Sequence, residues 1–418
     1  MTLQQTITEM AARTKAASAT LSILSTEKKN AVLKTVADLL IREKEYIQQQ
    51  NAKDLSNGKE KGLSEAMLDR LALTDAVIDS MVQGLGELIA LPDPVGTIED
   101  FTTRPNGLQV GRMRVPLGVI AMIYESRPNV TIDGAALCLK AGNGIILRGG
   151  SEAIHSNLAL GAVLKKALEE HGISPDAVQV VPVADREAVS YLLELEDTID
   201  LVIPRGGEGL IRLVVSKSKI PVLKHYKGVC HVYVDKDADL TKAVPILINA
   251  KTHRPGVCNA MEGILIHRDV SDRFIPEVVS AMQELGVEFR GCPKSVAIDG
   301  RIKVADESDW GTEFLDLRVC IKVVSGFEEA AEYIRKYGSQ HTESIVTENY
   351  TTARRFIAQT DASAVMVNAS TRFNDGGQLG LGAEIGISTT KLHAYGPMGL
   401  TELTTRKFVV YGEGQTRK

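Results

Sequence analysis

The sequence predicts an α/β protein with two parallel-sheet domains and a small hairpin for oligomerisation. From residue 117 onward, short and fully apolar segments alternate with helical ones, a pattern typical of parallel strands buried on both faces. A similar alternation begins again near residue 234. Polar and apolar residues alternate over 108–115, after the turn signal Pro105-Asn106-Gly107, and this predicts a hairpin over 102–116.

The first 95 residues or so read as helices, since Val32, Val36, Leu39 and Leu40 recur at helical spacing. The first α/β block then follows in chain order. Its expected strands are 117–124, 145–147, 178–183 and 201–203, and its expected helices are 130–140, the segment from Ser151 to just before Gly172, and the segment ending at Ser216. Parallel sheets of this kind bind ligands beyond the carboxyl ends of their strands.

The second block carries a further set of apolar strands and amphipathic helices. We expect strands over 263–267, 319–324, 344–347 and 364–368, and helices near 270–284, 327–337 and 350–359. A last strand over 406–411 has alternating character, and we interpret it as an edge that pairs with another subunit.

The composition of the chain argues against several classes of function. The 48 lysines and arginines are outnumbered by 53 aspartates and glutamates, so the net charge of -5 argues against a general nucleic-acid binder. No apolar run approaches the roughly 20 residues that cross a membrane, and the first residues do not resemble a secretory signal. Five cysteines, an odd number without metal-ligand spacing, favour a reduced cytoplasmic chain with no metal site.

Cys258 is the strongest candidate for a nucleophile. It follows Arg254-Pro255-Gly256 on a loop between an apolar helical stretch and a strand, and His253 and Arg254 are its charged neighbours. Cations and backbone donors stabilise a thiolate, the form that attacks carbonyl carbons. The alternative, a small buried apolar residue, describes the other four cysteines better, because they lie in apolar helix, strand or turn segments: Cys138, Cys230, Cys292 and Cys320.

Two glycine-rich turns follow expected strands of the first block. Arg148-Gly149-Gly150-Ser151 and Pro204-Arg205-Gly206-Gly207 each offer backbone donors and a cation at a helix start, which suits a phosphate or a ribose. Either turn alone is weak evidence, because short strand-to-helix loops are often rich in glycine. Two of them on one sheet, followed by a candidate nucleophile, indicate a dinucleotide and a thiol that act together.

Long motifs give the chain a family resemblance. Most of its length resembles the aldehyde dehydrogenase superfamily, and within it the members that reduce an acyl phosphate in proline biosynthesis. The motifs that carry the resemblance are Tyr124-Glu125-Ser126-Arg127-Pro128-Asn129-Val130-Thr131, Leu147-Arg148-Gly149-Gly150-Ser151-Glu152-Ala153, Pro204-Arg205-Gly206-Gly207, Arg254-Pro255-Gly256-Val257-Cys258-Asn259-Ala260 and 368–377.

This resemblance implies an aldehyde dehydrogenase-like fold with two Rossmann-like domains. It also implies reduction of L-glutamyl 5-phosphate by NADPH to L-glutamate 5-semialdehyde and phosphate, through a thioester on Cys258. Asn129 corresponds to the oxyanion-stabilising asparagine of the superfamily, although Ser126 lies closer by simple counting. Glu313 corresponds to the glutamate that holds the nicotinamide ribose. Cofactor contacts are expected from Arg148, Gly149, Ser151, Arg205, Gly206, Gly207 and Glu313.

One departure from the superfamily concerns water. Hydrolytic members carry a glutamate that activates water on the thioester, whereas the matching stretch here, 222–228, contains no carboxylate. Its cations suit an acyl phosphate, although Lys224 and His225 are about as well explained as a solvated strand end. The residues expected to contact substrate or phosphate are Lys224, His225, Arg254 and Arg372.

The resemblance also divides the chain. We expect a dinucleotide-binding domain from 1–101 and 117–233 with the tail 387–401, a catalytic domain over 234–386, and an oligomerisation module from 102–116 and 402–418. The alternatives are a hydrolytic NAD(P)-dependent aldehyde dehydrogenase and a non-catalytic nucleotide-binding protein. No kinase segment is present, so the acyl phosphate must come from another polypeptide, and we expect glutamate 5-kinase as a partner and a homo-oligomeric assembly.

Overall fold

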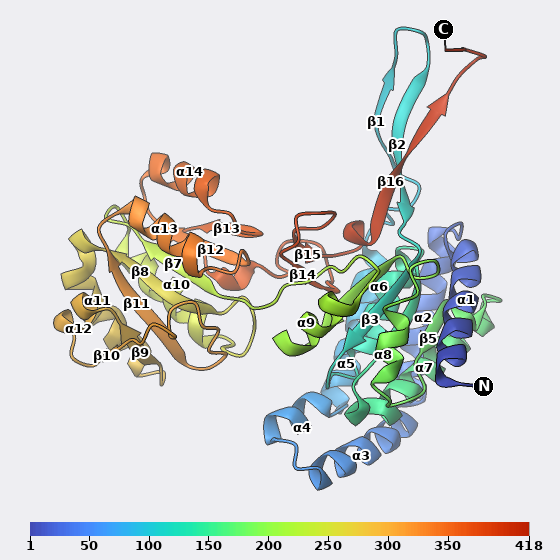
Figure 1. The fold of residues 1–418 in the computed structure, drawn as a ribbon, viewed down its shortest axis with the longest axis horizontal. Coiled ribbons are helices and arrows are strands. Elements are labelled where there is room, and N and C mark those ends of the chain that lie inside the picture. The colour runs from blue at the N-terminus through green and yellow to red at the C-terminus, as the bar shows by residue number, and fades with distance from the viewer. Residues whose placement is uncertain (418) are drawn as a thin grey trace. The chain divides into compact units, whose positions relative to one another are not determined.

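The computed structural model describes residues 1–417 and divides them into two units (Figure 1). Unit 1 comprises Met1–Lys224, Gly380–Gly386 and Met398–Lys418, and unit 2 comprises His225–Leu379 and Ile387–Pro397. The sequence placed the first boundary at 233, nine residues too late, because the strand Cys230–Val234 pairs within the sheet of unit 2. The tail expected in unit 1 also differs, since 387–397 belongs to unit 2 and 380–386 to unit 1.

A parallel sheet in the order β5-β4-β3-β6 forms the centre of unit 1. Every residue of β3 is buried, and so is every residue of β4, as the apolar runs predict. Helices connect successive strands, and the order reverses beside β3, where β6 pairs on the side opposite β4. The elements are β3 (Val119–Tyr124), α6 (Val130–Lys140), β4 (Gly144–Arg148), η1 (Ser151–Ala153), α7 (Ile154–Glu170), η2 (Pro175–Ala177), β5 (Val178–Val180), α8 (Glu187–Leu192), β6 (Leu201–Arg205) and α9 (Glu208–Lys217).

The N-terminal helices pack on this sheet and its helices. Thr2 begins the first of them with a reciprocal capping box to Gln5, and its buried face includes Ile7 and Met10. Ile7, Met10 and Ala11 share one apolar cluster with Val119 and Ala121 of the sheet, which covers that face. These helices are α1 (Leu3–Leu21), α2 (Thr26–Arg42), α3 (Lys44–Glu60), α4 (Glu65–Leu71) and α5 (Asp75–Ala90).

A three-stranded antiparallel sheet extends from unit 1, with the order β1-β2-β16 (Figure 1). It contains β1 (Ile98–Thr103), β2 (Gln109–Pro116) and β16 (Thr404–Tyr411), so the hairpin begins four residues earlier than the sequence predicted. The C-terminal strand pairs along its whole length with β2 of the same chain, from Thr404↔Pro116 to Tyr411↔Gln109. Its other edge has no partner strand within residues 1–417. The short segment η4 (Thr401–Leu403) leads into it.

Unit 2 is built on a parallel sheet in the order β10-β9-β11-β8-β7-β12-β13. Successive residues of one strand face opposite sides of the sheet, so Val232 and Val234 lie in one apolar cluster while Tyr233 lies in another. The strands are β7 (Cys230–Val234), β8 (Met261–His267), β9 (Glu288–Gly291), β10 (Lys303–Val304), β11 (Arg318–Val324), β12 (Thr342–Val346) and β13 (Ala364–Val367).

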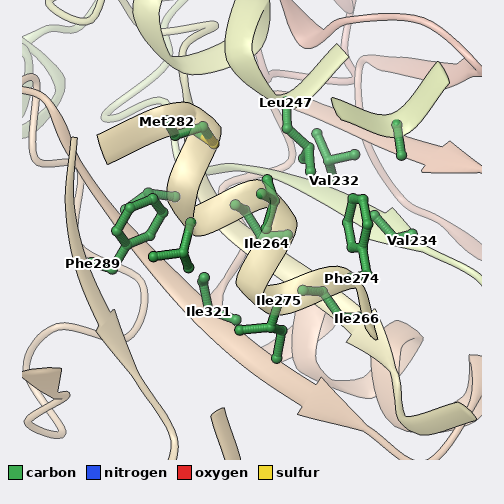
Figure 2. Packing of buried hydrophobic residues seen from close by; sticks show 14 of the residues in the cluster. Val232, Val234, Leu247, Ile264, Ile266, Phe274, Ile275, Met282, Phe289 and Ile321 are labelled. Carbon is green, nitrogen blue, oxygen red and sulfur yellow. The ribbon is translucent and has the colours of Figure 1, made fainter. Parts of the chain in front are cut away.

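Helices cover both faces of this sheet. Figure 2 shows the larger core, in which Phe274, Ile275 and Met282 pack on Ile264 and Ile321. Phe327, Tyr333 and Phe356 close the opposite face. The helices are α10 (Leu240–Thr252), α11 (Arg268–Gln283), α12 (Pro293–Ile298), α13 (Phe327–Tyr337), α14 (Tyr350–Gln359) and η3 (Thr371–Phe373), and β14 (Gly386–Ser388) and β15 (Gly396–Met398) form a short two-stranded sheet.

The predicted α/β class is confirmed, and α6, α13 and α14 have the predicted bounds. The sequence missed α8, α12, β9 and β10, which are only two to six residues long and too short for a periodic pattern. Across residues 1–417 no helix is long and apolar enough to span a bilayer.

Candidate active site

Three loops meet at the amino edge of the sheet in unit 2. Cys258 precedes β8, His225 precedes β7, and His341 directly precedes β12. Because β8, β7 and β12 are neighbouring parallel strands, the segments that lead into them lie at one edge of the sheet. The site of unit 2 therefore lies at the opposite edge from the one where open α/β sheets usually bind ligands.

The Cys258 thiol lies close to two imidazoles. The Sγ atom of Cys258 and one ring nitrogen each of His225 and His341 lie within 4.8 Å of one another. The two rings are 5.4 Å apart between centroids and meet edge to face. The thiol and His225 are half-buried, whereas His341 is fully buried. His225 was expected from the sequence, and His341 was not.

Hydrogen bonds orient both rings. His225 Nδ1 lies 2.8 Å from the carbonyl oxygen of Ile387, and because a carbonyl only accepts, Nδ1 carries the proton. The other nitrogen of His225 is therefore the basic one. His341 Nδ1 lies 2.8 Å from the Thr342 hydroxyl and 3.8 Å from the sulfur of Cys230.

The backbone around Cys258 is tightly held. The buried Cys230 thiol donates to the Cys258 carbonyl over 3.2 Å, and burial raises the pKa of Cys230, which keeps this donor protonated. Asn259 donates to the carbonyl of Asn374 over 2.9 Å, and Thr371 donates to the carbonyl of Asn259 over 2.7 Å. The loop that follows β13 thus fixes the segment next to the thiol.

Two arginines, Arg254 and Arg372, lie in the neighbourhood of the thiol. Burial lowers the pKa of Arg372, and the positive charge of Arg254 lowers it further, while the carboxylate of Asp375 opposes this, as would a thiolate at Cys258. The two guanidinium groups are thus close enough to repel each other beside the thiol, and Arg372 also contacts Nδ1 of the exposed His253 over 3.3 Å. A pair of crowded cations beside a nucleophile is suited to an anionic substrate.

Glu313 also lies beside the Cys258 loop, where its carboxylate accepts a hydrogen bond from the backbone of Gly228 over 2.9 Å. The following turn is held by Glu262, which accepts from Leu315 over 3.3 Å. Glu262 pairs with Lys251 over 2.7 Å, and both side chains are almost completely buried. Burial raises the pKa of Glu262 to about 7 and lowers that of Lys251.

The two glycine turns of unit 1 lie at the carboxyl edge of its sheet, on either side of β3. Gly206 and Gly207 are exposed, and the Gly207 amide donates to Glu125 over 3.0 Å. The neighbouring Glu152 accepts from both the amide and the hydroxyl of Ser126, over 2.8 and 2.6 Å. This edge includes the position where the strand order reverses, which is where such sheets bind nucleotides.

Arg148 lies beneath its turn and is only 7% exposed. Its guanidinium donates to the carbonyls of Gly149, Ala184 and Asp185, over 2.6 to 3.2 Å. These bonds hold the backbone of the loop that precedes the exposed Arg186. The guanidinium of Arg148 therefore positions this loop at the carboxyl edge of the sheet. Ser151, also expected to bind the cofactor, is exposed at the start of η1.

The remaining expected residues are also in unit 1. Asn129 precedes α6, and its amide donates to Asp133 over 3.0 Å; burial raises the pKa of Asp133 to about 6. Ser126, the alternative oxyanion donor, has a positive φ of 31° and is bonded to Glu152. Arg205 is half-buried, and Lys224 is the last residue of the first segment of unit 1.

Comparisons with known proteins show the family. The family model described as "Aldehyde dehydrogenase family" matches residues 2–294. A protein of Desulfotalea psychrophila named γ-glutamyl phosphate reductase is 69% identical over the full length of both chains, and one of Desulfatibacillum aliphaticivorans with the same name is 60% identical. The chain belongs to the γ-glutamyl phosphate reductases of the aldehyde dehydrogenase family.

Solved structures place this family member among similar folds. The γ-glutamyl phosphate reductase of Thermotoga maritima is 47% identical with a TM-score of 0.97, and the match covers 99% of this chain and 100% of that one. An acetylating aldehyde dehydrogenase from Geobacillus thermoglucosidasius, 18% identical with a TM-score of 0.70, shares the fold over 100% of this chain and 98% of its own. The aldehyde dehydrogenase-like fold expected from the motifs is therefore confirmed.

Sequence reasoning missed three parts of the site. His341 is 83 residues from Cys258 in the chain and carries no local motif. The buried ion pair of Lys251 and Glu262 was also missed. A charged residue within an apolar strand, such as Glu262, is a signal in the sequence that could have indicated it. No pattern in the sequence indicated the role of Gly228, because that role is to let its backbone approach the backbone of Cys258 closely, and only the folded chain shows this contact.

Proposed function

We propose that this protein reduces L-glutamyl 5-phosphate to L-glutamate 5-semialdehyde with NADPH, releasing phosphate, as the second step of proline biosynthesis from glutamate. The names of the full-length relatives support this substrate. The observation that carries the proposal is Cys258, a half-buried thiol close to two imidazoles and to Arg254 and Arg372. A thiol close to cations suits attack on an acyl carbon that bears an anionic leaving group.

The first half of the reaction requires only residues of unit 2. The basic nitrogen of His225 takes the thiol proton, and the thiolate attacks the acyl carbon of the substrate. The new carbon–sulfur bond replaces the carbon–oxygen bond to phosphate, and phosphate leaves with that electron pair. Arg254 and Arg372 stabilise the charge that develops on the leaving group.

The glycine turns of unit 1 fit a dinucleotide. A side chain at Gly206 would meet the Glu125 carboxylate 2.6 Å away, and Gly207 has open space around its Cβ position. We assign the contacts with the cofactor to Arg148, acting through its loop, and to Gly149, Ser151, Arg205, Gly206 and Gly207, with Glu313 for the ribose. When bound, the nicotinamide supplies a hydride to the acyl carbon of the thioester.

Release of the aldehyde completes the cycle on the protein side. The tetrahedral adduct on Cys258 expels the thiolate, and the carbonyl of the product forms. We assign stabilisation of the oxyanion to Asn129, whose amide has a second N–H beyond the one that binds Asp133. Segment 222–228 contains no carboxylate that could activate water, which protects the thioester from hydrolysis.

The rival function is hydrolytic oxidation of an aldehyde to an acid. One assay separates it from the proposal: reduction of NADP by L-glutamate 5-semialdehyde, with and without inorganic phosphate, in the wild type and in Cys258→Ala. We expect strict dependence on both phosphate and Cys258. Steady oxidation to free glutamate in phosphate-free buffer would establish the hydrolytic reaction instead.

We also propose a homo-oligomer of at least two chains through the sheet β1-β2-β16. Its outer strand exposes Phe408, Val410 and Tyr411, which are 67, 53 and 54% accessible. Light scattering at assay concentrations tests this, and a monomer would exclude it. Because an acyl phosphate is labile, we further propose direct transfer from glutamate 5-kinase, which a pull-down with the purified kinase would test.

A further inference from the structure

His225, Cys258 and His341 form a set of donors that no sequence spacing revealed. His225 lies 33 positions before Cys258 in the chain, and His341 lies 83 positions after it. Each of the three residues belongs to a loop that precedes a different strand. Their ligand atoms nevertheless lie within 4.8 Å of one another. Two imidazole nitrogens and a thiolate are a ligand set typical of zinc sites that keep one position open.

The distances are close to those of a metal centre. A tetrahedral zinc ion with bonds of about 2.0–2.3 Å holds its ligand atoms about 3.3–3.6 Å apart. The sulfur and the two ring nitrogens, now within 4.8 Å of one another, therefore have to approach by about 1 Å or slightly more to bind a zinc ion. The half-buried Cys258 side chain can rotate toward the two imidazoles, while hydrogen bonds hold His225 and the buried His341.

The surroundings of the two rings also suit a metal. Imidazoles that bind zinc usually donate their second ring N–H to a carbonyl or a carboxylate, which fixes the tautomer. His225 has this arrangement already, with Nδ1 donating to the Ile387 carbonyl over 2.8 Å. His341 is oriented by the Thr342 hydroxyl, 2.8 Å from Nδ1. Both imidazoles are thus already oriented in the metal-free protein, which reduces the entropy lost when a metal ion binds.

We propose that His225, Cys258 and His341 form an inhibitory site for Zn²⁺ or a similar soft divalent cation. Binding replaces the thiol proton, which passes to solvent, with a sulfur–metal bond, and water completes the coordination. The sulfur electron pair that would attack the acyl carbon is then held by the metal. The consequence for turnover rests on the proposed function, whereas the binding itself rests on geometry alone.

The direct test is a titration of the purified full chain with Zn²⁺ in a buffer that does not bind metals, followed by calorimetry. We expect one tight site per chain, reversed by EDTA, whose affinity falls by more than about tenfold in Cys258→Ser and in His225→Gln. Cys292→Ser is the matched control, because Cys292 is also half-buried and free but lies in the N-terminal turn of α12. It should retain the affinity of the wild type.

A second readout identifies the ligands. Co²⁺ in place of Zn²⁺ should give a sulfur-to-metal charge-transfer band with tetrahedral visible bands, and Cys258→Ser should remove the charge-transfer band. Equal affinity in the wild type and in Cys258→Ser, or loss of the site in Cys292→Ser, would overturn the proposal. Since binding is measured without substrate, a protein that binds zinc but lacks reductase activity would refute only the proposed function.

Discussion

Gly228 and Cys258 touch through their backbones: a methyl group added to Gly228 would overlap the carbonyl oxygen of Cys258. The Gly228 amide is at the same time bound by Glu313. The residue that was assigned to the cofactor and the loop that carries the thiol are thus coupled through one glycine. The φ angle of Gly228 is not positive, so the requirement for glycine is space rather than backbone conformation.

We therefore expect Gly228→Ala to move the Cys258 loop and lower kcat/KM by about a hundredfold, since a displacement of about 1 Å has such an effect on a reacting group. Steady-state kinetics with circular dichroism would measure it. Gly256→Ala is the matched control, because its nearest neighbour would be 3.8 Å away, at the carbonyl of Leu315. Equal losses in the two variants would show that the contact with Cys258 is unimportant.

Cys258→Ala should abolish turnover while folding and NADPH binding persist, because the thiol is the only group assigned to attack the substrate. Cys292→Ala is the control, since hydrogen bonds from Val323 and Ser295 outweigh burial and lower the pKa of Cys292, which makes it the rival thiol. Turnover and NADPH fluorescence titration would be compared in both. Activity above a few per cent in Cys258→Ala would refute the assignment.

His225→Ala should raise the KM for phosphate in the reverse direction more than the KM for the aldehyde, because His225 is a cation available to phosphate once it has taken the thiol proton. A charge-assisted contact with phosphate contributes about 1.5–3 kcal/mol, so the phosphate-dependent step should slow by roughly ten- to hundredfold. The same test applies to Arg254→Ala and Lys224→Ala. Lys294→Ala, at an exposed position in α12, should change neither constant. If the aldehyde KM rose most, His225 would instead act on the acyl group.

Arg148→Ala should raise the KM for NADPH more than the KM for NADH. Its guanidinium holds the carbonyls of Ala184 and Asp185, so its loss frees the loop that presents Arg186, a cation suited to a 2′-phosphate. Initial rates with both cofactors would measure this, with Lys217→Ala on the surface of α9 as the control. Equal effects on both cofactors would remove Arg148 from the explanation of cofactor preference.

Lys251→Met should destabilise the protein by about 3–5 kcal/mol at neutral pH, because it leaves the buried Glu262 carboxylate without its partner. Burial already raises the pKa of Glu262 from 4.5 to about 7. A carboxyl whose pKa is higher when folded binds its proton more strongly in the folded state, so stability is greatest at low pH and falls as pH rises through this range.

Urea unfolding of Lys251→Met at pH 5 and pH 8 would measure this difference. The double variant Lys251→Met with Glu262→Leu should recover most of the stability, because no charge remains buried. A destabilisation that does not change with pH in the single variant would show that Lys251 does not affect the ionisation of Glu262 in the fold.

Local patterns in the sequence were enough to predict the class of the fold, most of the longer elements and the candidate nucleophile Cys258. The helices α6, α13 and α14 could be predicted because side-chain periodicity and end signals are local properties of the chain. Cys258 could be distinguished from Cys138 because a loop with Pro and Gly differs in composition from a buried helix face.

Contacts between distant residues depend on the three-dimensional fold. His341 joins Cys258 because β8, β7 and β12 are neighbours in the sheet, and strand order is set by long-range pairing that no local pattern encodes. The close approach of Gly228 to Cys258 depends on the same pairing, and so does the assignment of β7 to unit 2. Arg148 resembled a phosphate-binding side chain in the sequence, yet the fold directs it to three carbonyls, because a buried guanidinium must satisfy its donors.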